Sequence, residues 1–149
     1  MSLIKIVNLN KIYDANKISI HALKDINLEI EKGEFTAIVG PSGSGKTTLL
    51  NMIGGLDSPT SGKVFINNID ISNLKPDELI DFRLHNIGFV FQSFNLIPVL
   101  TAKENVEFIM LLQGIPKEER EKRTIELLNA VGLGDKIEAR PFELSGGQQ

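Results

Sequence analysis

The stretch Gly40-Pro41-Ser42-Gly43-Ser44-Gly45-Lys46-Thr47 decides how the rest of the sequence is interpreted. Its spacing, a glycine followed after four residues by Gly-Lys-Thr, is typical of a loop that binds phosphate. The apolar residues 35–39 before it predict a buried strand, and residues 47–53 after it predict a helix that ends at Gly54-Gly55. The alternative is a surface turn rich in Gly and Ser that contains a lysine by chance. The flanking strand and helix argue against that alternative.

The residue types of this loop suit an anionic ligand. Gly40, Gly43 and Gly45 allow backbone conformations that a Cβ would obstruct, so that successive N–H groups converge on an anion. The start of the following helix adds unpaired N–H donors and a partial positive charge. Lys46 supplies a mobile charge for the β- and γ-phosphates, and the Thr47 hydroxyl is a ligand for Mg²⁺. The sequence therefore predicts a nucleoside triphosphate site.

Composition limits the remaining possibilities. A chain of 149 residues with 42% hydrophobic residues predicts one globular domain. The net charge of −3 gives no bulk basicity for nucleic acid, and the absence of cysteine excludes disulfides and thiolate metal sites. No apolar stretch approaches the ~20 residues needed to span a bilayer, and the N-terminus lacks the layout of a signal peptide. We expect a cytoplasmic protein whose link to any membrane runs through a partner.

The remaining pattern predicts strands followed by helices. Alternation predicts strands over residues 3–9 and 23–30, and a hairpin that turns at Asn67-Asn68. A second buried strand is predicted over residues 87–91, ending at Gln92. Helices are predicted at three places, which are residues 77–84 after Pro76, the segment from the Thr101/Glu104 capping box to Gln113, and the segment from Pro116 to about Val131.

A second motif, Leu144-Ser145-Gly146-Gly147-Gln148-Gln149, stands at the other end of the sequence. Alone, Ser-Gly-Gly indicates only a helix-capping turn. Here it follows the phosphate loop and Gln92 in the order used by ATP-binding cassette (ABC) ATPases, and it resembles the signature sequence of that family. Residues 59–64, 87–98 and 100–106 resemble most the lipoprotein-release and macrolide-export class within it.

The resemblance implies an α/β fold, namely a P-loop NTPase (ABC ATPase) core with an antiparallel β subdomain and a helical subdomain. We expect residues 1–149 to form a partial ATP-binding domain, with the C-terminal part of the core missing. The β subdomain and the phosphate-loop core would occupy about residues 1–91. The glutamine loop, the helical subdomain and the signature would occupy about residues 92–149. The strand before the phosphate loop would then lack its sheet neighbours.

Roles follow from the resemblance, residue by residue. Tyr13 would stack on adenine, although an ordinary tyrosine at a strand end is an equally good interpretation. Gln92 would contact Mg²⁺ and the attacking water, with Thr47 as the other metal ligand. Lys46, Gln92 and Ser145 would be the catalytic residues, Ser145 acting on the nucleotide of a second subunit. The nucleotide-binding residues would be Tyr13, Gly40, Pro41, Ser42, Gly43, Ser44, Gly45, Lys46, Thr47, Thr48, Ser145, Gly146 and Gly147.

The implied activity is that of an ATPase that uses ATP and Mg²⁺ and drives a membrane transporter of the lipoprotein, macrolide or peptide export class. The implied partners are a second ATP-binding subunit, paired head to tail when ATP binds, and an integral membrane permease that holds the protein at the inner face of the membrane. We expect no nucleic acid partner. Because no apolar run ending in Asp-Glu is present, residues 1–149 alone are expected to bind ATP without efficient hydrolysis.

Two other functions stay open at this point. One is a soluble ABC ATPase that acts on nucleic acid or ribosomes, and the other is a nucleotide-binding fragment that does not hydrolyse ATP. A GTPase is a poor fit because no Asn-Lys-x-Asp guanine motif is present.

Overall fold

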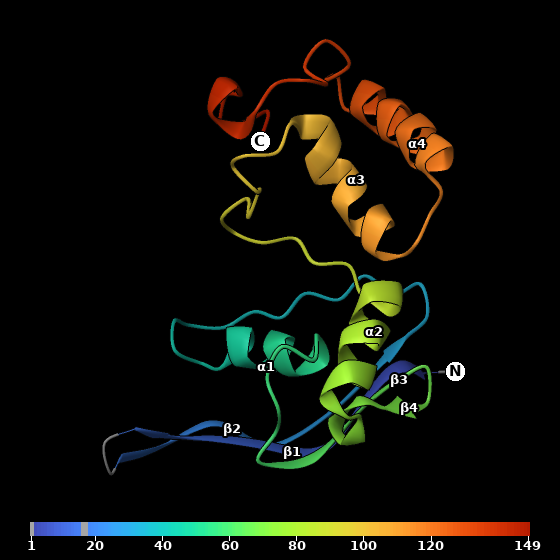
Figure 1. Ribbon diagram of the computed structural model, residues 1–149. Coiled ribbons are helices and arrows are strands. Elements are labelled where there is room, and N and C mark those ends of the chain that lie inside the picture. The colour runs from blue at the N-terminus through green and yellow to red at the C-terminus, as the bar shows by residue number, and fades with distance from the viewer. Residues whose placement is uncertain (1, 16–17) are drawn as a thin grey trace. The chain divides into compact units, whose positions relative to one another are not determined.

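The computed structural model describes residues 2–15 and 18–149, so Met1 lies outside the described residues (Figure 1). The chain divides into two compact units, Met1–Arg83 and Leu84–Gln149, which are described separately below. The assignment of these parts to a β subdomain with the phosphate loop and to a helical subdomain stays a prediction. Across the described ranges, no helix is long and apolar enough to cross a membrane.

The first unit contains an antiparallel sheet with the strand order β2-β1-β3-β4. Its strands are β1 (Ser2–Ala15), β2 (Ile18–Glu31), β3 (Ser61–Ile66) and β4 (Ile69–Asp70). The predicted strands over residues 3–9 and 23–30 are confirmed, and both extend further than the alternation indicated. The predicted hairpin is confirmed too, because Asn67 and Asn68 connect β3 to β4 with φ values of 49° and 65°.

Irregularities in the β1–β2 ladder explain a burial pattern that simple alternation does not give. Ile6 and Leu9 are both buried although they are three residues apart, and the pairing register shifts between them. Asn8 lies in this interval with φ of 48°, and its amide donates to Oδ1 of Asn27 at 2.9 Å. An extra residue in one strand turns the next side chain back to the same face. The bulge therefore adds Leu9 to the core.

Two helices follow, of which the first lies in the first unit and the second begins there and runs past the last residue of that unit, Arg83. Helix α1 (Lys46–Ile53) starts at the phosphate loop and buries Met52, and α2 (Pro76–Asn86) buries Phe82 after the short η1 (Ile71–Asn73). The predicted stop of α1 is confirmed, because its C-cap is Gly54, whose amide donates to Leu50 O at 2.8 Å. The buried apolar residues of this unit are Ile6, Leu9, Leu23, Met52, Val64, Ile66, Ile71 and Phe82.

The two predicted buried strands, residues 35–39 and 87–91, are wrong as predicted. Neither segment joins the sheet, and Phe35 is 99% exposed and Val39 86% exposed. Val90 of the second segment is fully exposed. Burial of such strands requires a neighbouring strand on each side, and none of the described residues supplies one. The expectation that the strand before the phosphate loop lacks sheet neighbours agrees with this result.

The second unit is built from α3 (Ala102–Leu112), α4 (Lys117–Ala130) and η2 (Pro141–Glu143). The predicted capping box is confirmed, since Thr101 Oγ1 accepts from the Glu104 amide and Glu104 Oε2 accepts from the Thr101 amide. Ala102, Leu128 and Leu144 form the buried core of this unit. Lys103 on α3 pairs with Glu121 on α4 at 2.9 Å, which links the two helices at their surface.

Candidate nucleotide-binding site

The phosphate loop, residues 40–47, leads directly into α1. Gly45 is the N-cap of this helix with φ of 87°, in the left-handed region that favours glycine. Because Gly45 has no side chain, it cannot cap the first N–H groups of α1. These donors and the positive end of the helix dipole therefore lie where the predicted phosphate would bind.

Lys46, the first residue of α1, folds back over the loop. Its Nζ donates to the carbonyl oxygens of Gly40 and Pro41, both at 2.8 Å, and lies 3.5 Å from Ser44 Oγ. The ammonium is thus held by carbonyl oxygens of the loop. A phosphate ligand would compete with these oxygens for the same ammonium. Lys46 and the loop glycines thus lie together, and their role in binding phosphate stays a prediction.

The three glycines of the loop differ in why a side chain is excluded. A Cβ on Gly45 would lie 2.5 Å from the carbonyl oxygen of Ala22 and 3.1 Å from Leu23 Cδ2. A Cβ on Gly40 would lie 2.8 Å from Ser44 Oγ. At Gly43 it would meet no atom of the described residues within 4 Å, although the φ of 79° still favours glycine. The loop is therefore packed against β2 at Gly45 and open to solvent at Gly43, which fits a cradle for an external anion.

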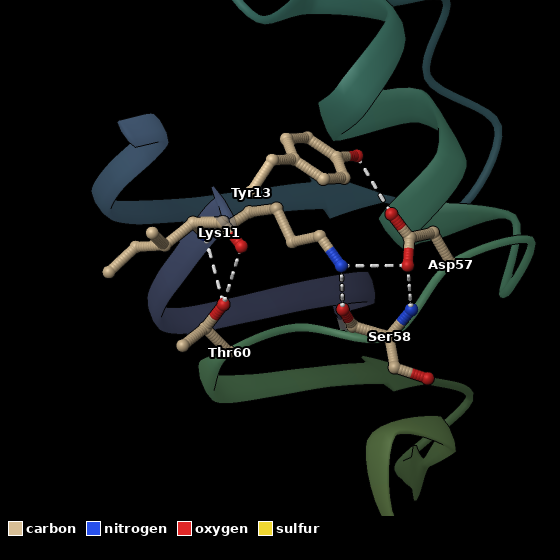
Figure 2. Close-up of polar contacts among 6 residues, drawn as sticks. Lys11, Tyr13, Asp57, Ser58 and Thr60 are labelled. Carbon is tan, nitrogen blue, oxygen red and sulfur yellow. Dashed lines mark hydrogen bonds and ion pairs between the residues drawn. The ribbon is translucent and has the colours of Figure 1, made fainter. Parts of the chain in front are cut away.

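Tyr13 lies near the beginning of α1 and is held by a polar cluster. Its hydroxyl donates to Asp57 Oδ2 at 2.7 Å, while Lys11 Nζ lies 4.7 Å from the ring centroid (Figure 2). The Thr48 hydroxyl also hydrogen-bonds the Tyr13 side chain, and this contact opposes the larger effects that raise the pKa of Tyr13. The structure thus brings Tyr13 together with Thr48, which follows the phosphate loop in α1.

The pKa shifts in this cluster report its hydrogen bonds. The hydrogen bond to Asp57, followed by partial burial, raises the pKa of Tyr13 above its ordinary value. Burial acts to raise the pKa of Asp57, but hydrogen bonds from Lys11, Tyr13 and the Ser58 amide outweigh it and the pKa of Asp57 is lowered. A neutral tyrosine hydroxyl therefore faces a charged carboxylate near neutral pH.

Gln92 and the signature residues belong to the second unit. Gln92 is exposed and follows Phe91, whose ring stacks on that of Phe89 with centroids 5.8 Å apart. Thr47 is exposed and belongs to the first unit. Because Thr47 and Gln92 belong to different units, their assignment as a pair of Mg²⁺ ligands stays a prediction. No group of three or more His, Cys, Asp or Glu side chains in the described part of the chain could hold a metal ion.

Ser145, Gly146 and Gly147 form a turn rather than an extended tail. The amides of Gln148 and Gln149 donate to Ser145 O at 2.8 and 3.0 Å, and the Ser145 amide donates to Gln148 Oε1 at 2.9 Å. This is one half of a capping box, in which the residue three positions on returns to the N-cap amide. An added Cβ at Gly146 or Gly147 would meet no described atom within 4 Å. The turn thus presents two glycines to open space.

Sequence reasoning missed the residues that support these sites. Lys11 and Asp57 around Tyr13 were not identified, although Lys11 and Tyr13 occupy alternate positions of one strand. Gln149 was not identified as an anchor, and its Nε2 donates to the carbonyl oxygens of Pro141 and Leu144. No pattern in the sequence predicts either contact, because each depends on how segments distant in the sequence pack together.

Comparison with known proteins gives the family. Residues 23–149 match the ABC transporter family. An ABC transporter ATP-binding protein of Thermotoga maritima is 50% identical over 145 residues, which cover 97% of this chain and 62% of that protein. The macrolide export ATP-binding/permease protein MacB of Brucella abortus is 48% identical over 147 residues, 99% of this chain and 23% of that protein.

Solved structures indicate the same family. The ABC transporter ATP-binding protein MJ0796 of Methanocaldococcus jannaschii is 50% identical over 151 residues, covering 99% of this chain and 64% of that protein. A dimeric structure of MJ0796 bound to ADP and Pi superimposes with a TM-score of 0.89 at 49% identity and covers 97% of this chain and 64% of that one. The chain thus spans less than two thirds of the length of these relatives. It belongs to the family of ABC transporter ATP-binding proteins.

Proposed function

We propose that this protein is the ATP-binding and ATP-hydrolysing subunit that couples energy to an ABC membrane transporter of the exporter type. The geometry of Lys46 carries the proposal, because its ammonium lies over the phosphate loop at the start of α1. The similarity to MacB supports a transporter of the macrolide, lipoprotein or peptide class. The protein would then work at the inner face of the membrane, held there by its permease.

In this proposal the residues of the first unit bind the triphosphate. Lys46 exchanges the carbonyl oxygens of Gly40 and Pro41 for phosphate oxygens, and the amides at the start of α1 donate to the same anion. The Thr47 hydroxyl would hold Mg²⁺, which would supply positive charge to the β- and γ-phosphates, and the role of Gln92 as a second ligand stays a prediction. The Tyr13 ring stacks on the adenine base.

The signature turn acts in a second copy of the protein. We propose that Ser145, Gly146 and Gly147 of one subunit donate to the γ-phosphate on the loop of the other, in a head-to-tail homodimer. The open space around both glycines and the half capping box at Ser145 suit this contact. The dimeric structures of MJ0796 support a paired arrangement. ATP binding then closes the pair and hydrolysis releases it.

Two variants test these roles separately. Lys46→Ala is expected to weaken ATP binding by about 10- to 150-fold, the range for hydrogen bonds to charged groups, as measured by isothermal titration. Ser145→Arg is expected to leave ATP binding intact and to abolish ATP-dependent dimerisation in sedimentation experiments. Asn73→Arg, a change to the same side chain at an exposed position of η1, serves as the control. Dimerisation of Ser145→Arg at the wild-type nucleotide concentration would refute the shared site.

Hydrolysis is tested on its own. We propose that residues 1–149 alone bind ATP and do not hydrolyse it efficiently, because the groups named above position phosphate and none of them is a carboxylate base. Single-turnover hydrolysis by residues 1–149 is compared with that by the intact protein. Equal rates would show that these residues already contain the complete catalytic apparatus.

A further inference from the structure

A cluster beside α1, the helix that follows the phosphate loop, contains two charged residues to which the proposed function gives no role. Figure 2 shows Lys11 and Tyr13 on β1 facing Asp57 and Ser58, which belong to the segment after α1. Thr60 completes the cluster. All five residues lie in the first unit, and every contact used below is within it.

The Lys11 ammonium is fully engaged within the protein. Its Nζ donates to Asp57 Oδ1 at 2.7 Å and to the Ser58 carbonyl oxygen at 2.7 Å, and it also lies over the Tyr13 ring. The Lys11 side chain is only 12% exposed. An ammonium that already holds a carboxylate, a carbonyl and an aromatic face is a poor candidate for direct phosphate binding. Lys11 therefore acts on Tyr13 and Asp57.

These contacts leave Tyr13 with one available surface. The hydroxyl is engaged by Asp57 Oδ2, and the ammonium of Lys11 covers one face of the ring. Tyr13 nevertheless keeps 38% of its surface exposed. We therefore expect a ligand to contact the ring face opposite Lys11, and a flat aromatic base is what such a face binds.

Backbone contacts fix the position of the ring relative to α1. The Ile12 amide, between Lys11 and Tyr13, donates to Thr60 Oγ1 at 2.9 Å, and the Thr60 amide donates to Asn10 O at 2.9 Å. The Asp57 amide donates to Asn51 O in α1 at 3.4 Å. Asp57 therefore ties the tyrosine ring to the same helix whose first residue is Lys46.

We propose that Asp57 is a positioning residue of the nucleotide site, which with Lys11 holds the Tyr13 ring so that one face accepts a purine base by stacking alone. The proposal rests on the proposed function, because it assumes that the phosphates bind at Lys46. Since the Tyr13 hydroxyl and the Lys11 ammonium are both engaged, neither of them offers the base a free hydrogen-bonding group. Adenine and guanine are therefore expected to bind Tyr13 alike.

The test compares ATP, GTP and inorganic tripolyphosphate, which lacks a base, by isothermal titration with the intact protein. Tyr13→Ala should weaken ATP and GTP binding by about 5- to 150-fold, the range for stacking of one base on an aromatic ring. Asp57→Ala should weaken both by about 3- to 10-fold, because a mobile ring keeps part of its stacking. Tripolyphosphate should bind within about twofold of wild type in every case, since the phosphate contacts are unchanged.

Two further variants separate positioning from folding. Tyr13→Phe keeps the ring and removes the contacts of its hydroxyl to Asp57 and Thr48, so it should weaken ATP and GTP binding at least as much as Asp57→Ala. The double variant Tyr13→Ala/Asp57→Ala should be no weaker than Tyr13→Ala, because Asp57 acts through the ring. Asp70→Ala is the control, since Asp70 also pairs with a lysine, Lys63 at 3.5 Å, away from Tyr13. It should not change ATP affinity.

Several results would overturn the proposal. Equal losses of ATP and tripolyphosphate binding in Asp57→Ala would show a general structural role. Additive losses in the double variant, or a loss for ATP and not for GTP, would exclude action through stacking. Wild-type affinity for ATP in both Asp57→Ala and Tyr13→Phe would show that the ring needs no positioning. If the wild-type protein binds none of the three ligands, the proposed function fails instead.

Discussion

Replacing Gly45 by alanine should damage the first unit more than the same change at Gly43. Both glycines have left-handed φ values, 87° at Gly45 and 79° at Gly43. A non-glycine residue in that region costs about 1–2 kcal/mol, and both variants lose this amount. Only Gly45 adds a steric term, because its new Cβ would lie 2.5 Å from the Ala22 carbonyl oxygen, whereas ordinary contact begins near 3.4 Å.

The size of the steric term follows from what must move. Ala22 lies at an irregularity of the β1–β2 pairing, where Lys11 pairs with Leu23 and Ile12 with His21. Relief of the clash shifts backbone in β2 or in the phosphate loop, which as overpacking costs about 1–3 kcal/mol. We expect a loss in the free energy of unfolding of about 2–5 kcal/mol for Gly45→Ala and about 1–2 kcal/mol for Gly43→Ala.

The chain supplies its own probe for this comparison. It contains one tyrosine and no tryptophan, and that tyrosine, Tyr13, lies in the first unit. Urea unfolding followed by tyrosine fluorescence therefore reports on the unit that carries the substitution. Equal midpoints for Gly45→Ala and Gly43→Ala, with equal slopes, would refute the assignment of a close contact between the loop and β2.

Three other predictions concern the second unit. Leu128→Ala removes a buried core side chain and should lower the free energy of unfolding by about 2–5 kcal/mol, measured by urea titration followed by circular dichroism. Asn105→Ala should increase amide hydrogen exchange of Ile97, because the Ile97 amide donates to Asn105 Oδ1 while Asn105 Nδ2 holds the carbonyl oxygens of Ile97, Leu100 and Thr101; unchanged exchange at Ile97 would contradict this role. The hydrogen bond from Lys103 lowers the pKa of Glu121 below its ordinary 4.5, so the stability that Glu121 contributes is present above pH 4.5 and is lost as the pH falls through the lowered pKa. Lys103→Met should reduce this acid dependence in thermal melts, and an unaltered dependence would count against the pair.

Local signals in the sequence were sufficient where one short segment determines the structure. Thr101 and Glu104 predict the start of α3 because both hydrogen bonds of a capping box lie within four residues. Asn67-Asn68 predicts the β3–β4 turn because asparagine tolerates positive φ. The phosphate loop and α1 were predictable for the same reason.

Prediction failed where the outcome depends on distant segments. Residues 35–39 have the composition of a buried strand, yet burial requires neighbouring strands, and a single segment cannot indicate whether they exist. Lys11 and Asp57 are 46 positions apart in the sequence, so no periodicity relates them. The joint burial of Ile6 and Leu9 depends on a bulge, which departs from the alternation used to predict strands.

The oxygen atoms around Lys46 have a consequence for which molecules the loop accepts. Two carbonyl oxygens at 2.8 Å already solvate the ammonium, so any incoming group must compete with them. A neutral hydroxyl or amide would only replace one dipole by another of similar strength, with little net attraction. A polyanion brings a full negative charge to Lys46 Nζ, so it gains binding free energy that a neutral ligand does not. Lys46 would therefore favour ligands with a high negative charge over neutral ligands of similar shape. Added salt should weaken binding more steeply for ligands with more negative charges.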